Sequence, residues 1–114
     1  MAAYQAQNKK VSSCKCGPDY IDPMFHKEVL GVDSKNLDLF FSSEDELRKE
    51  YAKHAADAEL VITEGVMGYY DGMRLDSVTA SSYDVARTLD IPAVLILPCK
   101  GAALSPVSYT HLRA

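Results

Sequence analysis

KCGPDYIDPMFH, at residues 15–26, runs from the end of a β-prone segment into the start of a helix. Apart from Lys15, residues 11–16 are small or β-branched, and they predict a short strand. The Gly-Pro pair after them ends it, because proline cannot donate to a sheet ladder and glycine allows a sharp turn. Asp22 and Pro23 then predict a helix start, with aspartate as the cap, and Gly31 predicts the helix end. The stretch therefore predicts a strand, an acidic loop and a helix in succession.

A second stretch of the same kind, EGVMGYYDG, lies at residues 64–72. It follows an apolar run at residues 60–63, which is typical of a strand buried on both faces of a parallel sheet. Between the two stretches, residues 43–58 predict an amphipathic helix that begins with a capping box formed by Ser43 and Glu46.

The remaining segments complete an alternating pattern. A helix is expected from Ser81 or Ser82 to Leu89, and a buried strand at residues 93–97. Residues 33–36 are polar and predict a loop. Strand, helix, strand, helix, strand is the order of an α/β fold, so we expect a three-layer sandwich with a mostly parallel sheet. Ligands of such sheets bind beyond the carboxyl ends of the strands, where both acidic stretches fall.

The composition favours one globular domain. The chain has 114 residues, of which 47% are hydrophobic and 25% charged. A net charge of −4 argues against nucleic acid or an anionic membrane as the main partner. Three cysteines form no disulfide framework and favour reduced thiols, and no apolar leader or spanning segment is evident. We therefore expect a cytoplasmic protein.

The acids of the second stretch have two interpretations each. Glu64 ends a buried strand, where an unpaired charge is costly, so it needs either a magnesium ion or a salt bridge to Lys15 or Arg74. Asp71 lies among glycines that allow the backbone either to approach a ligand closely or simply to turn.

The first stretch can hold a phosphate and an organic ligand. Lys15 at a strand end can bind a phosphate as a point charge. Asp19 and Asp22 can orient a metal or a polar group, although Asp22 can equally be only a helix cap. Tyr20, with the Ile beside it, can contact a ligand or pack, and we interpret His26 as a structural histidine rather than a ligand.

Together the two stretches closely resemble the ATP-binding domain of cobyrinic acid a,c-diamide synthase, a family of cobalamin biosynthesis. The resemblance extends from about residue 4 to residue 105, and residues 36–38 and 81–86 follow the same pattern. It implies a partial ATP-binding domain over residues 1–105, of the dethiobiotin-synthetase-like, P-loop NTPase type. Residues 106–114 no longer follow the family pattern. We interpret them as a tail, for which a non-native origin is one explanation.

The resemblance also implies an activity. The family uses ATP and magnesium to activate the a and c carboxylates of cobyrinic or hydrogenobyrinic acid, and ammonia from glutamine then displaces phosphate. In this ligase, Lys15 would bind the nucleotide and face the transferred phosphate, while Glu64 and Asp19 would hold the metal. The loop residues expected to bind and orient the corrinoid are Asp19, Tyr20, Ile21 and Asp22. The acids expected to have catalytic roles are Asp19, Asp22, Glu64 and Asp71.

The chain departs from the family in one motif. No G-x-x-x-x-G-K-[ST] occurs in it, and no glycine is followed by lysine. The resemblance therefore implies that the P-loop and its strand precede Met1 and that a glutaminase domain follows. We expect a fragment that is inactive alone. The sequence leaves open whether the protein forms a homodimer.

Three alternatives remain. One is a related amidotransferase, either nickel-sirohydrochlorin a,c-diamide synthase or cobyric acid synthase. Another is a non-catalytic nucleotide-binding module of the partition-ATPase type. A protein of that type has no evident need of the acidic loop at residues 19–22, so the loop argues against this alternative. The last is a gene remnant without function.

Overall fold

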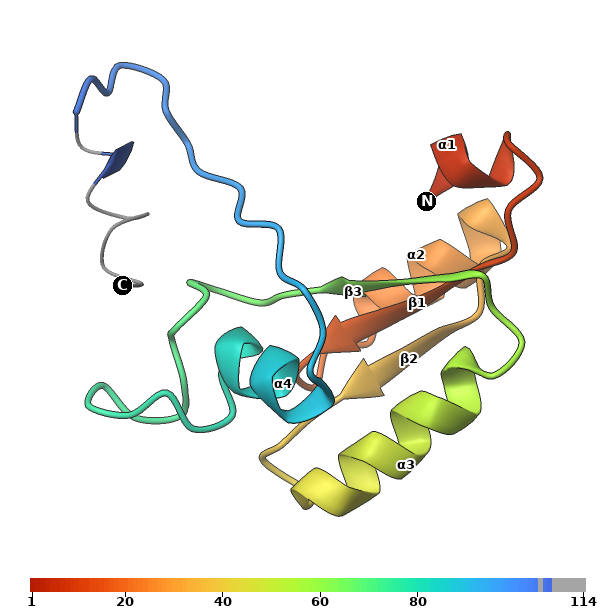
Figure 1. Ribbon diagram of the computed structural model, residues 1–114, viewed down its shortest axis with the longest axis horizontal. Helices are drawn as coiled ribbons and strands as arrows, with labels where there is room; N and C mark the ends of the chain where they lie inside the picture. The colour runs from red at the N-terminus through yellow and green to blue at the C-terminus, as the bar shows by residue number, and fades with distance from the viewer. Residues whose placement is uncertain (105, 108–114) are drawn as a thin grey trace.

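The computed structural model describes residues 1–104 and 106–107, and at its centre three strands form one parallel sheet (Figure 1). The strands are β1 (Val11–Cys16), β2 (Ser34–Leu37) and β3 (Leu60–Glu64), in the order β2-β1-β3. The helices are α1 (Ala2–Gln5), α2 (Ile21–Leu30), α3 (Glu44–Ala55) and α4 (Ser82–Leu89).

The helices cover both faces of the sheet. Helix α2 lies behind it in Figure 1, whereas α3 and α4 lie together on the other side. Side chains of a strand alternate between faces, so β1 contributes to both layers. Cys14 and Cys16 pack toward α3 and α4, whereas the Ser13 hydroxyl meets His26 of α2. The predicted α/β class with a parallel sheet between helical layers is confirmed.

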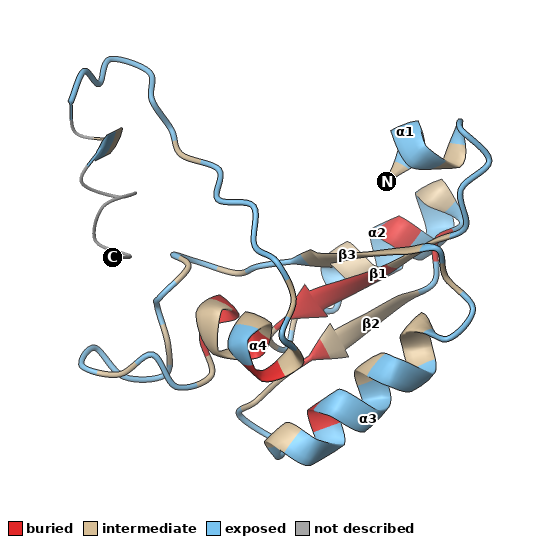
Figure 2. Cartoon of the chain, in the orientation of Figure 1, coloured by how far each residue is buried: buried red, intermediate tan, exposed pale blue. Residues whose placement is uncertain are grey.

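The core is small and lies between the sheet and the pair α3 and α4, where buried residues cluster in Figure 2. Burial raises the pKa of Cys14 to about 12 and that of Cys16 to about 11, so both thiols stay protonated at neutral pH. The buried hydrophobic residues of this cluster are Cys14, Cys16, Leu37, Leu47 and Val85.

Local signals placed most helices correctly. The Ser43 hydroxyl accepts a hydrogen bond from the Glu46 amide, and the Ser43 amide donates to the Glu46 carboxylate, which confirms the capping box of α3. Gly31 ends α2 in the left-handed conformation, with φ of 63°. The predicted cap of α2 was wrong, because the helix begins at Ile21 and Asp22 lies inside its first turn. The Ile21 amide donates instead to the Asp19 carboxylate.

Two strand predictions were wrong. Ser34–Leu37 forms β2, although we predicted a loop over most of it. Polar residues are tolerated there because β2 is an edge strand, with β1 as its one neighbour among residues 1–104 and 106–107. Conversely, residues 93–97 are apolar and β-prone but belong to no strand, because no neighbour pairs with their backbone in the described part of the chain. Propensity alone does not make a strand.

Two further predictions concern membrane-spanning segments and the C-terminal tail. Within residues 1–104 and 106–107, no helix is long and apolar enough to cross a membrane. The predicted tail at residues 106–114 lies outside the described residues except for its first two.

Candidate functional site

The ammonium group of Lys15 stands at the centre of an ionic cluster at the carboxyl end of the sheet. Its Nζ lies 2.7 Å from Asp22 Oδ2, 3.3 Å from Glu64 Oε1 and 3.9 Å from Asp19 Oδ2. It also donates to the Gly65 carbonyl oxygen at 3.4 Å. Lys15 is 5% exposed. We call Lys15, Asp19, Asp22 and Glu64 the Lys15 cluster.

The parallel pairing of β1 with β3 brings the two acidic stretches together. Lys15 and Glu64 are register partners, so the ends of both strands open at the same edge. A turn at Gly17, with φ of 77°, then leads to Asp19 and α2. The first turn of α2 returns Asp22 to the lysine. The salt bridge between Glu64 and Lys15, one of two interpretations from the sequence, is therefore present.

Hydrogen bonds favour the charged forms of Lys15 and Asp22. Burial by itself lowers the pKa of Lys15, but hydrogen bonds to Asp22 and Glu64 outweigh it and raise that pKa above its usual value. The hydrogen bond from Lys15 likewise lowers the pKa of Asp22. One ammonium among three carboxylates leaves two unbalanced negative charges, which attract a cation.

The donors of the cluster suit magnesium in kind. Carboxylate oxygens such as those of Asp19 and Glu64 are the ligands this ion prefers. However, no three His, Cys, Asp or Glu side chains of the described residues are arranged to hold a metal, and Lys15 stands between the acids. A divalent cation would therefore have to share or replace the ion pairs of Lys15. Glu64 would be the more accessible ligand, since 46% of its side chain is exposed against 33% for Asp19.

The structure leaves Asp71 outside the Lys15 cluster. Its Oδ2 accepts a hydrogen bond from the Gly68 amide at 3.0 Å, and it lines a separate hollow with Tyr70 and Arg74. No ion pair of the described residues includes Asp71. In this structure it closes a turn, which is the simpler of the two interpretations given above.

The residues expected to meet the organic ligand are exposed beside the cluster. Tyr20 is 73% exposed and Ile21 78% exposed. Both line a hollow of about 350 Å³ that also includes Val66 from the second acidic stretch. The two stretches therefore share one concave surface next to the carboxylates.

Sequence reasoning gave no functional role to two residues that lie at this edge of the sheet. His26, which we interpreted as structural, has its Nε2 3.7 Å from Glu64 Oε2. Asp38 follows β2, and its buried Oδ2 has no hydrogen-bond partner among the described residues, although Oδ1 accepts from the Phe40 amide. A strand end marks Asp38 as a candidate, but that signal was hidden because β2 was not predicted.

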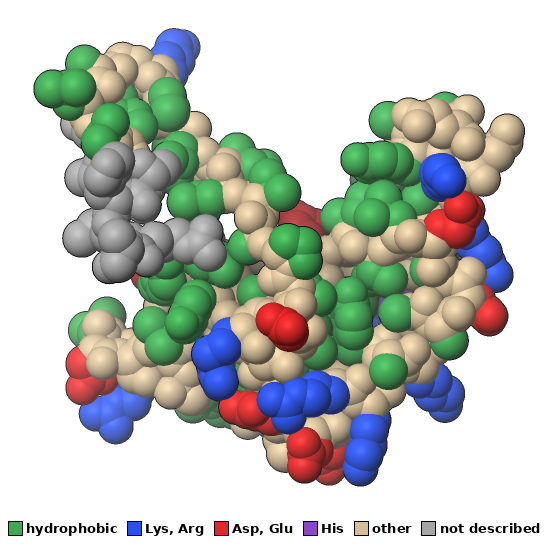
Figure 3. Space-filling model, in the orientation of Figure 1, with side chains coloured by type: hydrophobic (Ala, Val, Ile, Leu, Met, Phe, Trp, Pro, Cys, Tyr) green, Lys and Arg blue, Asp and Glu red, His purple; other side chains and the backbone are tan. Residues whose placement is uncertain are grey.

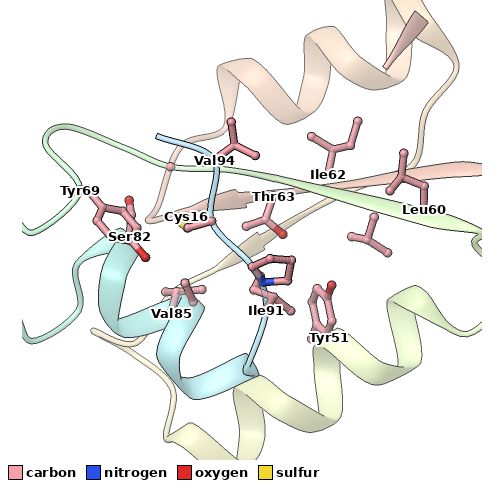
Figure 4. Close-up of a pocket in the computed structure, with 15 residues that line it drawn as sticks. Cys16, Tyr51, Leu60, Ile62, Thr63, Tyr69, Ser82, Val85, Ile91 and Val94 are labelled. Atoms are coloured by element: carbon pink, nitrogen blue, oxygen red, sulfur yellow. The ribbon is translucent and has the colours of Figure 1, made fainter. Parts of the chain in front are cut away.

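A larger groove lies along β3. Its volume is about 530 Å³, and apolar side chains from β3, α4 and the segment after α4 line it, among them Ile62, Val85 and Val94 (Figure 4). Val94 and Ile96 are almost fully exposed, and hydrophobic side chains cover the surface of this segment in Figure 3. The groove differs in chemistry from the Lys15 cluster, and nothing in the sequence predicted it.

A parallel sheet between helical layers defines an α/β protein, and proteins of this class bind ligands at the carboxyl edge of the sheet, where the Lys15 cluster lies. Comparison with curated proteins identifies the relatives. The chain is 43% identical over 105 residues to the cobyrinate a,c-diamide synthase of a Synechococcus species and 42% identical over 105 residues to that of Gloeobacter violaceus. It is 36% identical over 112 residues to the hydrogenobyrinate a,c-diamide synthase of Agrobacterium fabrum.

These matches cover 92%, 92% and 97% of the chain, so the resemblance drawn from the two motifs is confirmed. The chain is a relative of the cobyrinate and hydrogenobyrinate a,c-diamide synthases. It spans 23%, 23% and 26% of the length of these three relatives. No family model matches the chain, and neither does a solved structure.

Proposed function

We propose that the chain contributes part of the nucleotide and acceptor site of an ATP-dependent, glutamine-using ligase. The acceptor is cobyrinic or hydrogenobyrinic acid, whose a and c carboxylates are converted to amides in cobalamin biosynthesis. The names of the relatives support this acceptor class. A cytoplasmic location and a glutaminase domain in the same enzyme belong to the proposal.

The observation that carries the proposal is the Lys15 cluster. A buried ammonium with three carboxylates at a sheet edge suits phosphoryl transfer, in which catalysis consists of positioning and charge neutralisation. The acids keep Lys15 charged, and a cationic lysine is the form that binds phosphate. Magnesium, when bound by Glu64 and Asp19, would neutralise phosphate charge.

The other residues take roles that follow from their exposure. Tyr20 and Ile21 present accessible side chains beside the acids and would contact the organic acceptor. Asp22 holds Lys15 and orients its ammonium toward the ligand space. Asp71 is proposed as a second acid, which would require the turn at Gly68 to open. The acceptor carboxylate would then lie next to the phosphate bound by Lys15.

The test of this proposal replaces the Glu64 carboxylate. A chimera in which residues 4–105 replace the matching segment of the Synechococcus synthase is assayed for amide formation with cobyrinate, ATP, magnesium and glutamine. Glu64→Gln should lower kcat by about 100-fold or more, because it removes a cation ligand but no packing contact. Circular dichroism checks that the fold is intact.

The matched control is Glu28→Gln, which makes the same change on the exposed face of α2. It should leave kcat unchanged. Wild-type turnover by the Glu64→Gln chimera at saturating magnesium would refute the role of Glu64. An inactive unsubstituted chimera would count against the proposed function as a whole.

A further inference from the structure

We propose that His26 is a positioning residue which, held by Ser13, fixes the orientation of the Glu64 carboxylate. The proposal rests on the proposed function only in that Glu64 is taken to bind a cation. The contacts that define it are independent of that role. His26 lies on α2 and is 7% exposed, so its ring is held in place between the helix and the sheet.

One side of the imidazole ring meets two serine hydroxyls. Nδ1 lies 3.2 Å from Ser13 Oγ on β1 and 3.4 Å from Ser34 Oγ on β2. Ser13 is fully buried. Each hydroxyl can donate to a bare ring nitrogen or accept from a protonated one, so the serines alone do not select the tautomer.

The surroundings of the other ring nitrogen, Nε2, select the tautomer. Nε2 faces Glu64 Oε2 at 3.7 Å. If Nε2 carried no proton, its lone pair would face a carboxylate oxygen, and the two negative ends would repel each other. With the proton on Nε2, the ring presents a donor to Glu64, and a serine hydroxyl donates to Nδ1. The geometry thus favours the Nε2–H tautomer.

Glu64 then has electrostatic neighbours in two directions, although the 3.7 Å separation from His26 is longer than a hydrogen bond. Lys15 contacts Oε1 and His26 faces Oε2, so the carboxylate has one neighbour for each oxygen. Lys15 cannot keep all its carboxylate contacts while it binds a phosphate. His26 has no such second task, so it keeps Glu64 oriented when Lys15 turns to the ligand. Groups that contact a metal-ligating side chain fix the orientation of that side chain and influence the affinity of the site for the metal.

The tautomer can be read without any assumption about activity. Long-range ¹H–¹⁵N spectra of the labelled 114-residue chain at pH 8 distinguish the two ring nitrogens of each histidine, and His26→Gln assigns the signals. We expect the proton of His26 on Nε2 and a change in its ¹⁵N shift in Glu64→Gln. A proton on Nδ1, or no response to Glu64→Gln, would overturn the proposal.

A second measurement tests the consequence. Manganese is titrated into the chain and followed by water-proton relaxation. His26→Leu should weaken binding about 10-fold, the usual effect of losing a partner of a metal ligand. His26→Gln keeps an amide donor near the Nε2 position and should recover most of the affinity. Val29→Gln is the control, because Val29 is an exposed residue of the same helix, and it should leave manganese binding unchanged.

The outcomes separate the two proposals. If Glu64→Gln weakens manganese binding and His26→Leu does not, the role of His26 is wrong while the site stands. If Glu64→Gln has no effect, the proposed cation role of Glu64 fails, and the tautomer measurement still decides the contact of His26 with Glu64.

Discussion

At the ammonium of Lys15, burial and charge act in opposite directions. Removing the group from water favours its neutral form, whereas contacts with Asp22 and Glu64 favour the cation and prevail. The lysine is thereby kept charged at a buried position. The hydrogen bond from Lys15 in turn lowers the pKa of Asp22, so these two groups depend on each other.

This coupling predicts a pH-dependent effect of Asp22→Asn. Lys15 lowers the pKa of Asp22 in the folded state, and such a carboxylate stabilises the fold at pH values above its unfolded pKa of about 3.9. The contribution is lost as the pH falls through the lower, folded pKa. Asp22→Asn should therefore reduce the free energy of unfolding at pH 7, and the difference from wild type should shrink as the pH falls below the unfolded pKa.

Urea unfolding followed by circular dichroism at a series of pH values measures this difference. Asp57→Asn, on an exposed position after α3, is the control and should show no such dependence. An effect of Asp22→Asn that is the same at pH 7 and pH 3 would show that the ion pair is not its cause.

At the scale of elements, α3 is attached to the sheet through few apolar side chains. Its mean hydropathy is low, and Leu47 is its one buried residue among those described. Leu47 packs with Cys14, Cys16 and Val85, which joins α3 to β1 and α4. The charged pairs on the outer face of α3 add little, because exposed ion pairs contribute less than about 1 kcal/mol each.

Leu47→Ala should therefore lower the free energy of unfolding by about 2–5 kcal/mol, the range for truncating a buried leucine. The control is Leu75→Ala, since Leu75 is fully exposed, and its effect should stay within about 0.5 kcal/mol. Guanidinium unfolding of both variants measures the two values. Similar small losses would mean that the contact between α3 and the sheet is looser than the structure indicates.

At the scale of the whole molecule, the sheet is open on the side of β3. In the described part of the chain β3 pairs with β1 alone, and the apolar groove of about 530 Å³ runs beside its free edge. Unpaired edges of this kind favour association with other strands. The Lys15 cluster lies at the carboxyl ends of the strands, whereas the apolar groove runs along β3. The sheet thus carries two surfaces of different chemistry.

The 114-residue chain by itself should show no measurable ATP hydrolysis or corrinoid amidation. It contains no P-loop motif whose backbone amides could cradle the phosphates, and its net charge is −4. Each missing preorganised donor costs about 100- to 1,000-fold in rate. The assay measures phosphate release with magnesium, ATP and cobyrinate, with ammonia supplied directly. Adding a family-like P-loop segment before Met1 should recover activity, and turnover without it would show that the nucleotide site lies elsewhere.

The sequence by itself determined the local elements and the family. β1, β3, α3 and α4 follow from apolar runs and caps that act within a few residues. The two acidic stretches also predicted that carboxylates meet at the carboxyl edge of a parallel sheet, and Asp19, Asp22 and Glu64 do meet there.

The tertiary structure alone decided what lies between these acids and which residues join them. The register of β1 with β3 set Lys15 beside Glu64, and the docking of α2 brought His26 to the same carboxylate. It also made a strand of the polar Ser34–Leu37 and left residues 93–97 unpaired. The physical reason is that backbone pairing and ion pairing depend on neighbours distant in the chain, which local propensity does not encode.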